Sequence, residues 1–312
     1  MSGPTDFPPA ARDAILTWYG SRARALSFRR TTDPYAILVS EAMAQQTQAA
    51  RAGEAWTRFM GRFPTVDALA AASPADVLRA WQGLGYNRRA INLWLTARRI
   101  ADEFGGRVPS DIAVLQSLPG IGPYTARAIA ALAFGVPVGA VDTNVRRVLG
   151  RVVAGDTGVL APSELQQLAD GAVPIDRPGA WTHAVMDVGA TLCHPRRPAC
   201  GTCPARPWCR YASARAAEVG QGRVVPTRPT GAAARSVHEP PAPFRTTSRW
   251  LRGRILDRLR DAPHGEWVVL DASIGEHDPF AVERAMRALA NDGLLELAGD
   301  EPPDRRARLP IA

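Results

Sequence analysis

Four cysteines within one short segment carry the strongest chemical signal in this chain. They are its only cysteines and follow the spacing Cys193-x6-Cys200-x2-Cys203-x5-Cys209. A disulfide framework would spread its cysteines along the chain, whereas four thiolates from one segment can hold a metal cluster or a tetrahedral zinc ion. Structural zinc usually takes two Cys-x2-Cys pairs and this loop has one. The spacing therefore favours a four-iron cluster over zinc, with free thiols as the third alternative.

Two carboxyl groups stand in contrasting sequence surroundings. Glu41 lies about one helical turn after Ile37 and Leu38, so it shares their apolar helix face. Burial disfavours the charged form of a carboxyl group, so Glu41 could stay protonated and act as a general acid. Asp142 precedes an apolar helical stripe that begins at Val145, where backbone N–H groups and the helix dipole favour the ionised form. Each also has an ordinary interpretation, as a partly solvated helix residue and a plain helix cap.

A glycine-rich turn, Leu118–Thr125, separates two helical patterns and reads LPGIGPYT. Its helical flanks exclude the dinucleotide-binding motif, which follows a strand. Backbone N–H groups around Gly120 and Gly122, at the start of a helix, could bind a phosphate without reading base sequence. An ordinary helix–helix turn is the alternative.

The composition limits the class of protein and of partner. The chain has 312 residues, 46% hydrophobic and 22% charged, which is ordinary for a soluble globular protein with two domains. A net charge of +8 favours a polyanion such as nucleic acid. All 38 basic residues are arginine, so no lysine amine can form a Schiff base. Because we find neither a membrane-span pattern nor a secretory signal, we expect no membrane association and a cytoplasmic, nucleoid-associated location.

Residues 1–211 carry the hydrophobic pattern of a helical domain. Apolar residues recur at helical spacing and do not alternate, so we expect an all-α fold that positions the carboxylates and the cysteine loop. Breakers such as Ser73-Pro74 and Gly135 mark helix starts and stops. The predicted helical segments are Ala11–Tyr19, Tyr35–Phe59, Ala75–Trp81, Arg88–Phe104, Ile112–Leu118, Thr125–Phe134, Asn144–Val153, Ser163–Ala172 and Trp181–Leu192.

The remaining third of the chain changes character. Residues 212–246 are rich in Ala, Pro, Gly, Arg and Ser, which predicts a linker. Residues 247–312 regain a pattern and predict a small winged-helix-like α+β module. Its predicted elements are a helix containing Leu251 and Leu259, a short strand at Trp267–Leu270, a helix from Pro279 to about Asn291, and a hairpin joining Leu294–Leu297 to Ala307–Leu309.

Five motifs, taken in order, resemble the helix–hairpin–helix DNA glycosylases and, among them, the MutY-type adenine DNA glycosylases. The motifs are Ser40–Gln48, Gly83–Tyr86, Leu118–Thr125, Val141–Val148 and the cysteine spacing. The resemblance covers about residues 10–211 and implies the helix–hairpin–helix fold with a [4Fe-4S] cluster loop at 193–209. Residues 247–312 are too short for the β-rich domain with which many relatives read 8-oxoguanine. They resemble the short tails of some actinobacterial members.

The resemblance implies a role for each catalytic candidate. Glu41 would protonate N7 of a flipped adenine, and Asp142 would stabilise the cationic sugar that forms as the bond to the base breaks. Tyr124 and Asn144 would hold these acids by hydrogen bonds. The division of labour suits N-glycosidic cleavage, because an oxocarbenium-like state needs an acid for the leaving base and an anion beside the sugar.

The resemblance also implies contacts to DNA. Gln46 and Tyr86 would fill the stack around the mispair, Leu84 would act as a wedge, and Thr47 would contact the opposing guanine. Flipping a base costs a few kcal/mol, which inserted residues would offset.

Arg29 and Asp187 would border the adenine pocket. At that wall the chain departs from the family's usual Leu-Pro-Trp-Arg, since Leu26–Arg29 reads LSFR. Ala44 stands where a leucine is usual, and Asn87 replaces a common second tyrosine.

A related enzyme class, endonuclease III, nicks the strand with a lysine just after the hairpin, where this chain has Tyr124. We therefore predict a monofunctional, monomeric enzyme that acts on double-stranded DNA with adenine opposite 8-oxoguanine or guanine. A sliding clamp and a downstream abasic-site endonuclease are its candidate protein partners. The alternatives are a thymine or uracil mismatch glycosylase and a non-catalytic iron–sulfur DNA-binding protein. Glu41 argues against the first, because pyrimidine excision does not need that acid, and Glu41 together with Asp142 argues against the second.

Overall fold

The computed structural model describes residues 6–155, 160–220, 243–299 and 305–311, nearly all of whose regular structure is helical. The chain divides into two compact units. Unit 1 comprises residues 1–38, 110–117 and 121–235, and unit 2 comprises residues 39–109, 118–120 and 236–312. Helix α2 (Pro34–Ala44) crosses the division. Within the described ranges, no helix is both long and apolar enough to span a bilayer.

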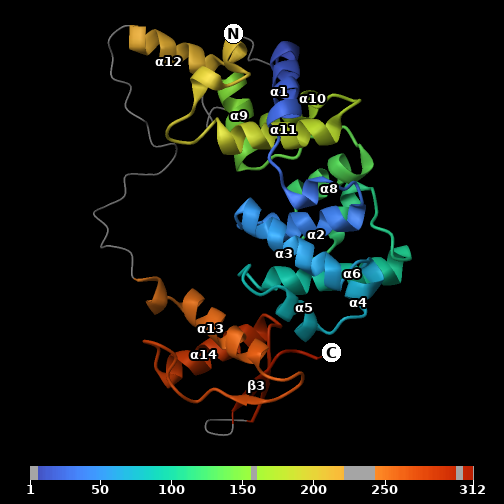
Figure 1. Ribbon diagram of the computed structural model, residues 1–312, viewed down its shortest axis with the longest axis vertical. Helices are drawn as coiled ribbons and strands as arrows, with labels where there is room; N and C mark the ends of the chain where they lie inside the picture. Colours follow the sequence, from blue (N-terminus) through green and yellow to red (C-terminus); the bar gives the residue numbers. More distant parts are fainter. Residues whose placement is uncertain (1–5, 156–159, 221–242, 300–304, 312) are drawn as a thin grey trace. The chain divides into compact units, whose positions relative to one another are not determined.

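Unit 1 is a helical bundle whose central helix is α11. This helix packs against α1, α8 and α9, and α9 also contacts α10 and α12 (Figure 1). The predicted stripe on α9 is confirmed, because Val145, Val148 and Leu149 are all buried in the core of this unit. The helices of unit 1 are α1 Pro9–Arg22, α7 Ile112–Ser117, α8 Pro123–Phe134, α9 Thr143–Val153, α10 Pro162–Gly171, α11 Pro178–Thr191 and α12 Arg210–Gly220, with 3-10 turns η1 Ser27–Arg29, η2 Cys200–Thr202 and η3 Arg206–Trp208.

The first half of unit 2 packs α4 and α5 against α6, and α3 joins them through α5. Figure 1 shows α4 alongside α6, and α5 contacts both α6 and α3. Phe59 and Trp81 meet edge to face in the core, with ring centroids 6.0 Å apart. Ser73 caps α5 as its position before a proline predicts, by accepting a hydrogen bond from the backbone N–H of Asp76. These helices are α3 Ala49–Arg62, α4 Val66–Ala70, α5 Pro74–Ala80 and α6 Arg88–Phe104.

The prediction of one helical segment over Tyr35–Phe59 is wrong at its centre. Helices α2 and α3 are separate and are joined by the turn Gln45–Gln48. Within that turn Gln46 has φ 53°, a left-handed backbone that no right-handed helix can contain. The helical spacing of apolar residues continues across the turn between α2 and α3. The hydrophobic pattern therefore did not reveal that the helix ends there.

The C-terminal module is the second half of unit 2 and has the predicted elements. Its hydrophobic core joins α13 to α14, with Leu251 and Leu259 facing Val282 and Leu289 as buried residues. The predicted hairpin is confirmed by the antiparallel pairing of β2 with β3, and β1 pairs with the other edge of β3 to give the order β1-β3-β2. The elements are η4 Phe244–Thr246, α13 Ser248–Asp261, β1 Val268–Val269, α14 Pro279–Asn291, β2 Glu296–Ala298 and β3 Arg306–Arg308.

The segment predicted as a linker, residues 212–246, differs at both ends. Helix α12 continues to Gly220, and η4 begins at Phe244. Alanine and arginine are good helix formers, so the compositional change at residue 212 does not end the helix there. The middle of the predicted linker, 221–242, lies outside the described residues.

Candidate active site and cysteine centre

The Leu118–Thr125 turn is a short hairpin between α7 and α8. Gly120 has φ +76°, and a Cβ built on it would lie 2.8 Å from Cβ of Asn92, so both conformation and space require glycine. The Thr96 hydroxyl donates to the carbonyl of Pro119 at 2.8 Å and fixes the turn to α6. Gly122 is the N-cap of α8 and supplies no capping side chain. Phosphate binding at this helix start remains a prediction.

Asp142 caps α9, as predicted, and its carboxylate receives two hydrogen bonds. The backbone N–H of Val145 donates to Oδ1 at 2.7 Å, and Nδ2 of Asn144 donates to Oδ2 at 2.9 Å. These two hydrogen bonds fix the orientation of the carboxylate at the start of α9. The predicted role of Asn144 in holding this carboxylate is therefore seen directly. The Tyr124 hydroxyl lies 3.8 Å from Sδ of Met186, and its predicted contact with the acids remains a prediction.

Arg147 was not predicted, yet it orients this carboxylate through Asn144. Its guanidinium donates to Oδ1 of Asn144 at 2.7 Å, which leaves the amide nitrogen directed at Asp142. The same guanidinium donates to the carbonyls of Gly189 at 2.6 Å and Cys193 at 2.5 Å. A Cβ at Gly189 would lie 2.5 Å from Cβ of Asn144, so a glycine there permits the close approach. Asp142 is thus connected to the start of the cysteine loop through Asn144 and Arg147.

Glu41 lies on α2 and is 9% exposed. Its neighbours Ile37 and Leu38 are also buried, so the predicted apolar face is confirmed. Glu41 therefore lies in the buried part of α2, where the general acid was expected.

Arg29 and Asp187 form a buried bidentate ion pair. Two nitrogens of Arg29 donate to the two carboxylate oxygens, each at 2.7 Å, and Nε of Arg24 donates to Oδ1 at 2.5 Å. Burial alone would raise the pKa of Asp187, but the hydrogen bonds from Arg29 and Arg24 outweigh it and hold the pKa below its usual value. Burial and the charge of Arg29 lower the pKa of nearby His183 to about 3, so this histidine is neutral at physiological pH.

The two predicted stacking residues share an unusual backbone. Gln46 and Tyr86, with φ 53° and 47°, are the non-glycine residues of positive φ in the described part of the chain. Such strain persists only where surrounding contacts impose it and is common at functional sites. Both side chains are exposed, and that of Tyr86 is 43% exposed.

Arg89, another residue that we did not predict, braces both strained loops. Its guanidinium donates to the carbonyl of Gln45 at 2.5 Å, to that of Gly85 at 3.0 Å and to the Thr47 hydroxyl at 3.2 Å. It also lies 5.3 Å from the ring centroid of Trp81. Only the long-range fold shows this role, because the chain contains many arginines.

Leu84, the predicted wedge, is placed differently from what we expected. Its side chain is 6% exposed and packs inside unit 2, while the exposed aromatic ring of the loop belongs to Tyr86. A buried leucine supports the loop rather than projecting from it. Thr47, predicted to contact the opposing guanine, is half-buried and bonded to Arg89.

The four cysteines line one apolar cavity, together with Val148, Val152 and Val188. Burial raises the pKa of the Cys200, Cys203 and Cys209 thiols, with that of Cys203 at about 11, and the neighbouring Cys193 raises all three further. Bound iron or zinc would offset this mutual repulsion and favour thiolates. In the described residues, no cysteine, histidine, aspartate or glutamate group is arranged to hold a single metal ion.

Arg151, a buried residue of α9, holds the cysteine loop by hydrogen bonds to its backbone. It is 2% exposed, and its Nη1 lies 3.4 Å from Sγ of Cys193 and 2.8 Å from the carbonyl oxygen of His194. Its Nη2 donates to the carbonyl of Pro195 at 2.8 Å. A buried guanidinium beside the sulfur of Cys193, in the cavity that the four cysteines line, suits a site that becomes anionic when it binds metal. The chemistry of the four sulfur donors suits a thiolate-bound metal cluster, but the described side chains are not arranged around a metal ion.

The fold and these residues agree with comparisons to known proteins. The model of the HhH-GPD superfamily of base excision DNA repair proteins matches residues 39–171. The structure of a thermostable thymine-DNA glycosylase is 30% identical, superposes with a TM-score of 0.62, and covers 65% of this chain and 95% of its own. An endonuclease III–DNA complex shares the fold, with a TM-score of 0.57 at 24% identity over 66% of this chain and 95% of its own. The chain belongs to the HhH-GPD superfamily of base excision DNA repair proteins.

Within that superfamily the chain is similar over nearly its whole length to adenine DNA glycosylases. The adenine DNA glycosylase of Mycolicibacterium smegmatis is 40% identical over 288 residues, which is 92% of each chain. So high a coverage extends into the C-terminal module, whereas the thymine-DNA glycosylase matches only about two thirds of this chain.

Proposed function

We propose that this protein is a monofunctional adenine DNA glycosylase of base excision repair. Its substrate is double-stranded DNA in which adenine is mispaired with 8-oxoguanine or guanine. The observations that carry the proposal are two carboxyl groups: Glu41 is buried on α2, and Asp142 is held by two hydrogen bonds at the start of α9.

In the proposed reaction the neutral Glu41 donates its proton to N7 of the flipped adenine. The bond between C1′ and N9 then breaks, its electron pair goes to the base, and the sugar becomes an oxocarbenium-like cation. The carboxylate of Asp142, already oriented by Asn144, stabilises that cation without reorganisation. Water then forms a bond to C1′ and gives up a proton, which returns to the carboxylate of Glu41 and leaves an abasic site. The chain has no lysine, so no side-chain amine cuts the strand by Schiff-base chemistry.

Residues of the strained loops would hold the DNA open while the adenine is flipped. Tyr86 and Gln46 are exposed and would enter the base stack, while buried Leu84 supports their loop. The hairpin at Gly120 and Gly122 would bind a backbone phosphate.

Arg29 and Asp187 are proposed to border the adenine pocket. The carboxylate of Asp187 is fully occupied by arginine donors and 0% exposed, which supports a role in positioning Arg29 rather than direct contact with the base.

We also propose that the four cysteines hold a [4Fe-4S] cluster. Their shared cavity and the buried Arg151 beside it support this. The cluster would cross-link the 193–209 loop and, through the contact of Arg147 with Cys193, help to fix the Asp142 segment. Visible absorption and iron analysis of the purified protein test this, and a colourless, zinc-loaded protein would contradict it.

The decisive experiment is a panel of duplexes that carry A:8-oxoG, A:G, T:G or U:G. Released bases are separated chromatographically, and strands are examined with and without alkali. We expect free adenine from the first two duplexes and strand breaks only after alkali. Glu41→Gln should lower single-turnover adenine release by roughly 10²–10⁴-fold, because it removes the proton donor. Glu54→Gln, an exposed change on the neighbouring α3, is the matched control and should leave the rate unchanged.

A thymine or uracil mismatch glycosylase is the second candidate, favoured by the structural likeness to a thymine-DNA glycosylase. Breakage confined to T:G or U:G strands would establish it in place of adenine excision. Binding without release of any base would establish a non-catalytic DNA-binding protein.

A further inference from the structure

A groove of about 920 Å³ lies within unit 2, between the Gln46 and Tyr86 loops on one side and α13 of the C-terminal module on the other. Gln46, Gly83 and Tyr86 line the first side, and Phe244, Trp250 and other residues around the start of α13 line the second. We call it the module groove. It contains the residues assigned above to the base stack, so whatever fills it lies next to the mispair.

The module is seated on this side of unit 2 by hydrogen bonds to the main chain. Nη2 of Arg79 on α5 donates to the carbonyl of Ala262 at 3.1 Å, and Nε of Arg260 on α13 donates to that of Leu78 at 3.0 Å. The backbone N–H of Ala75 donates to the carbonyl of Pro310 at 2.8 Å. Arg260 also donates to the side chain of Asn87, directly after the Tyr86 loop, at 2.7 Å. These reciprocal contacts fix α13 beside the strained loops.

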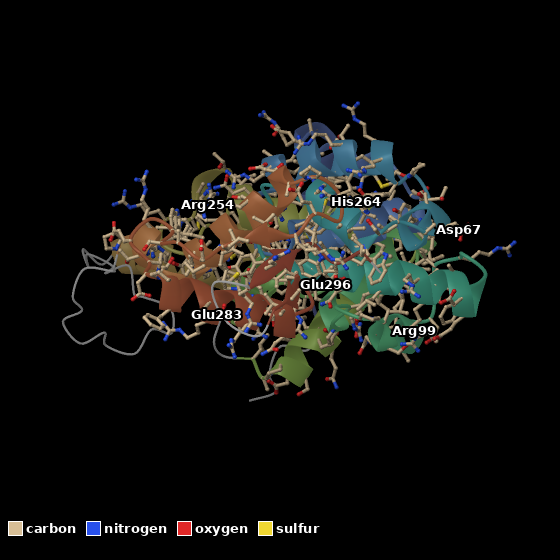
Figure 2. The ribbon with its side chains drawn as sticks, turned by 90° about the horizontal axis from the view of Figure 1, so that it is seen from below. Asp67, Arg99, Arg254, His264, Glu283 and Glu296 are labelled. Atoms are coloured by element: carbon tan, nitrogen blue, oxygen red, sulfur yellow. The ribbon has the colours of Figure 1, made fainter. Side chains whose placement is uncertain are left out.

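The module groove is strongly positive. Arg51, Arg88 and Arg89 line it from the helical half of unit 2, and Arg249, Arg252, Arg254 and Arg260 line it from α13, against one lining carboxylate, Asp257. Figure 2 labels Arg254 on this module.

Nearby carboxylates neutralise only part of this charge. Asp257 pairs with Arg254 and Arg260, and Asp292 pairs with Arg88 and Arg252. Within the described ranges no ion pair is seen for Arg249, which is exposed. A row of arginines that exceeds its acidic partners is suited to phosphates.

Arg249 connects the module to the stacking residue itself. Its guanidinium lies 4.4 Å from the ring centroid of Tyr86, and Arg89 lies 5.7 Å from the same ring. The ring of Tyr86 is therefore held by an arginine of the module and by Arg89 of α6. The backbone of Tyr86 is left-handed at this point. An aromatic ring flanked by guanidinium groups combines a surface for base stacking with cations for the adjoining phosphates.

We propose that the module groove holds the sugar–phosphate backbone of DNA beside the mispair, which makes the C-terminal module a DNA-binding element rather than an appendage. The inference rests on the proposed function, because it places the groove by the residues assigned to the base stack. Arg249 and Arg254 contact phosphates, and Arg249 also positions Tyr86.

The test compares two double variants of the full-length protein that lose equal charge. The first variant, Arg249→Gln with Arg254→Gln, removes two of the cations that line the groove. Arg258→Gln with Arg284→Gln removes two exposed arginines of the same module that do not line it. The dissociation constant for an A:G duplex whose adenine carries a 2′-fluoro sugar, which resists cleavage, is measured over a range of salt concentrations.

Removal of one phosphate-binding cation should reduce the slope of log Kd against log salt by about 0.9, so we expect a reduction of about 1.8 in the groove variant and roughly tenfold weaker binding. The control variant should keep the wild-type slope. Equal slopes in wild type and groove variant, or equal reductions in both variants, would overturn the proposal.

Adenine release by the wild-type protein separates the two claims. If adenine is released but the groove variant binds like wild type, the groove proposal fails and the proposed function stands. If no adenine is released while the groove variant alone has a reduced slope, the groove binds DNA and the proposed function fails.

Discussion

Two regions of this molecule position side chains in opposite ways. Around Asp142 in unit 1, the backbone is regular and the carboxylate is held by a chain of hydrogen bonds that runs through Asn144 to Arg147. Around Gln46 and Tyr86 in unit 2, the backbone itself is strained, and one arginine braces both loops.

The difference follows from what each region must do. An anion that stabilises a short-lived cation acts best when it is already oriented, so a hydrogen-bonded carboxylate on an unstrained helix is suitable. Residues proposed to enter a base stack must instead project from the protein surface. Here they do so from tight turns, whose positive φ values do not occur in a regular right-handed helix. The strained backbone of these loops is held by long-range contacts from Arg89, as is common at functional sites.

The largest effect is expected from a substitution at Asp142, in the first region. Asp142→Asn keeps a good helix cap but removes the negative charge, so single-turnover adenine release should fall by roughly 10³-fold. Asp278→Asn is the matched control, since Asp278 caps α14 by the same contact, to the N–H of Ala281 at 2.7 Å. Both variants should unfold at similar temperatures. An active Asp142→Asn enzyme would show that a neutral cap suffices.

The next effect breaks the brace of the second region. Arg89→Ala leaves several buried carbonyls without their donor, which should lower the free energy of unfolding by about 2–4 kcal/mol. Adenine release should fall as well, because Gln46 and Tyr86 lose their fixed backbone. Urea unfolding measures the first and single-turnover kinetics the second. Arg99→Ala, which removes an exposed ion pair with Glu103, should cost less than about 1 kcal/mol.

A pH titration probes the charged network of unit 1 at His183. Burial and Arg29 hold the pKa of this histidine at about 3 in the folded state, against an ordinary value of 6.5. The unfolded chain therefore binds a proton that the folded protein does not, and stability present above pH 6.5 is lost as the pH falls toward 3. The loss is at most about 1.4 kcal/mol per pH unit. His183→Gln should flatten this dependence in urea unfolding between about pH 6.5 and about pH 4.5, whereas an unchanged slope would assign the acid sensitivity to other groups.

The smallest effect sharpens the contrast between the two regions. Gln46→Gly relieves a positive φ and should raise stability by up to about 1 kcal/mol while it lowers adenine release, because the side chain for the base stack is lost. Asn144→Gly, on the regular helix α9, should lower both stability and activity. A destabilised Gln46→Gly protein would mean that the left-handed backbone carries no strain.

The sequence by itself determined the features that depend on near neighbours. The sequence predicted the Asp142 cap, the buried face that contains Glu41, the grouping of the four cysteines and the hairpin of the module. Capping, helical period and strand pairing act over a few residues, so the sequence records them. The absence of lysine excluded Schiff-base chemistry by a side-chain amine through composition alone.

Only the tertiary structure decided the contacts between distant parts of each unit. Arg29 and Asp187 pair across 158 positions, and Arg89 and Arg147 find their carbonyl acceptors only after their helices pack. The burial of Leu84 and the stacking of Arg249 on Tyr86 likewise depend on which surfaces meet. Hydrophobic spacing records that a residue is buried or exposed on its own element, but it does not record the sign of φ or the partner across the core.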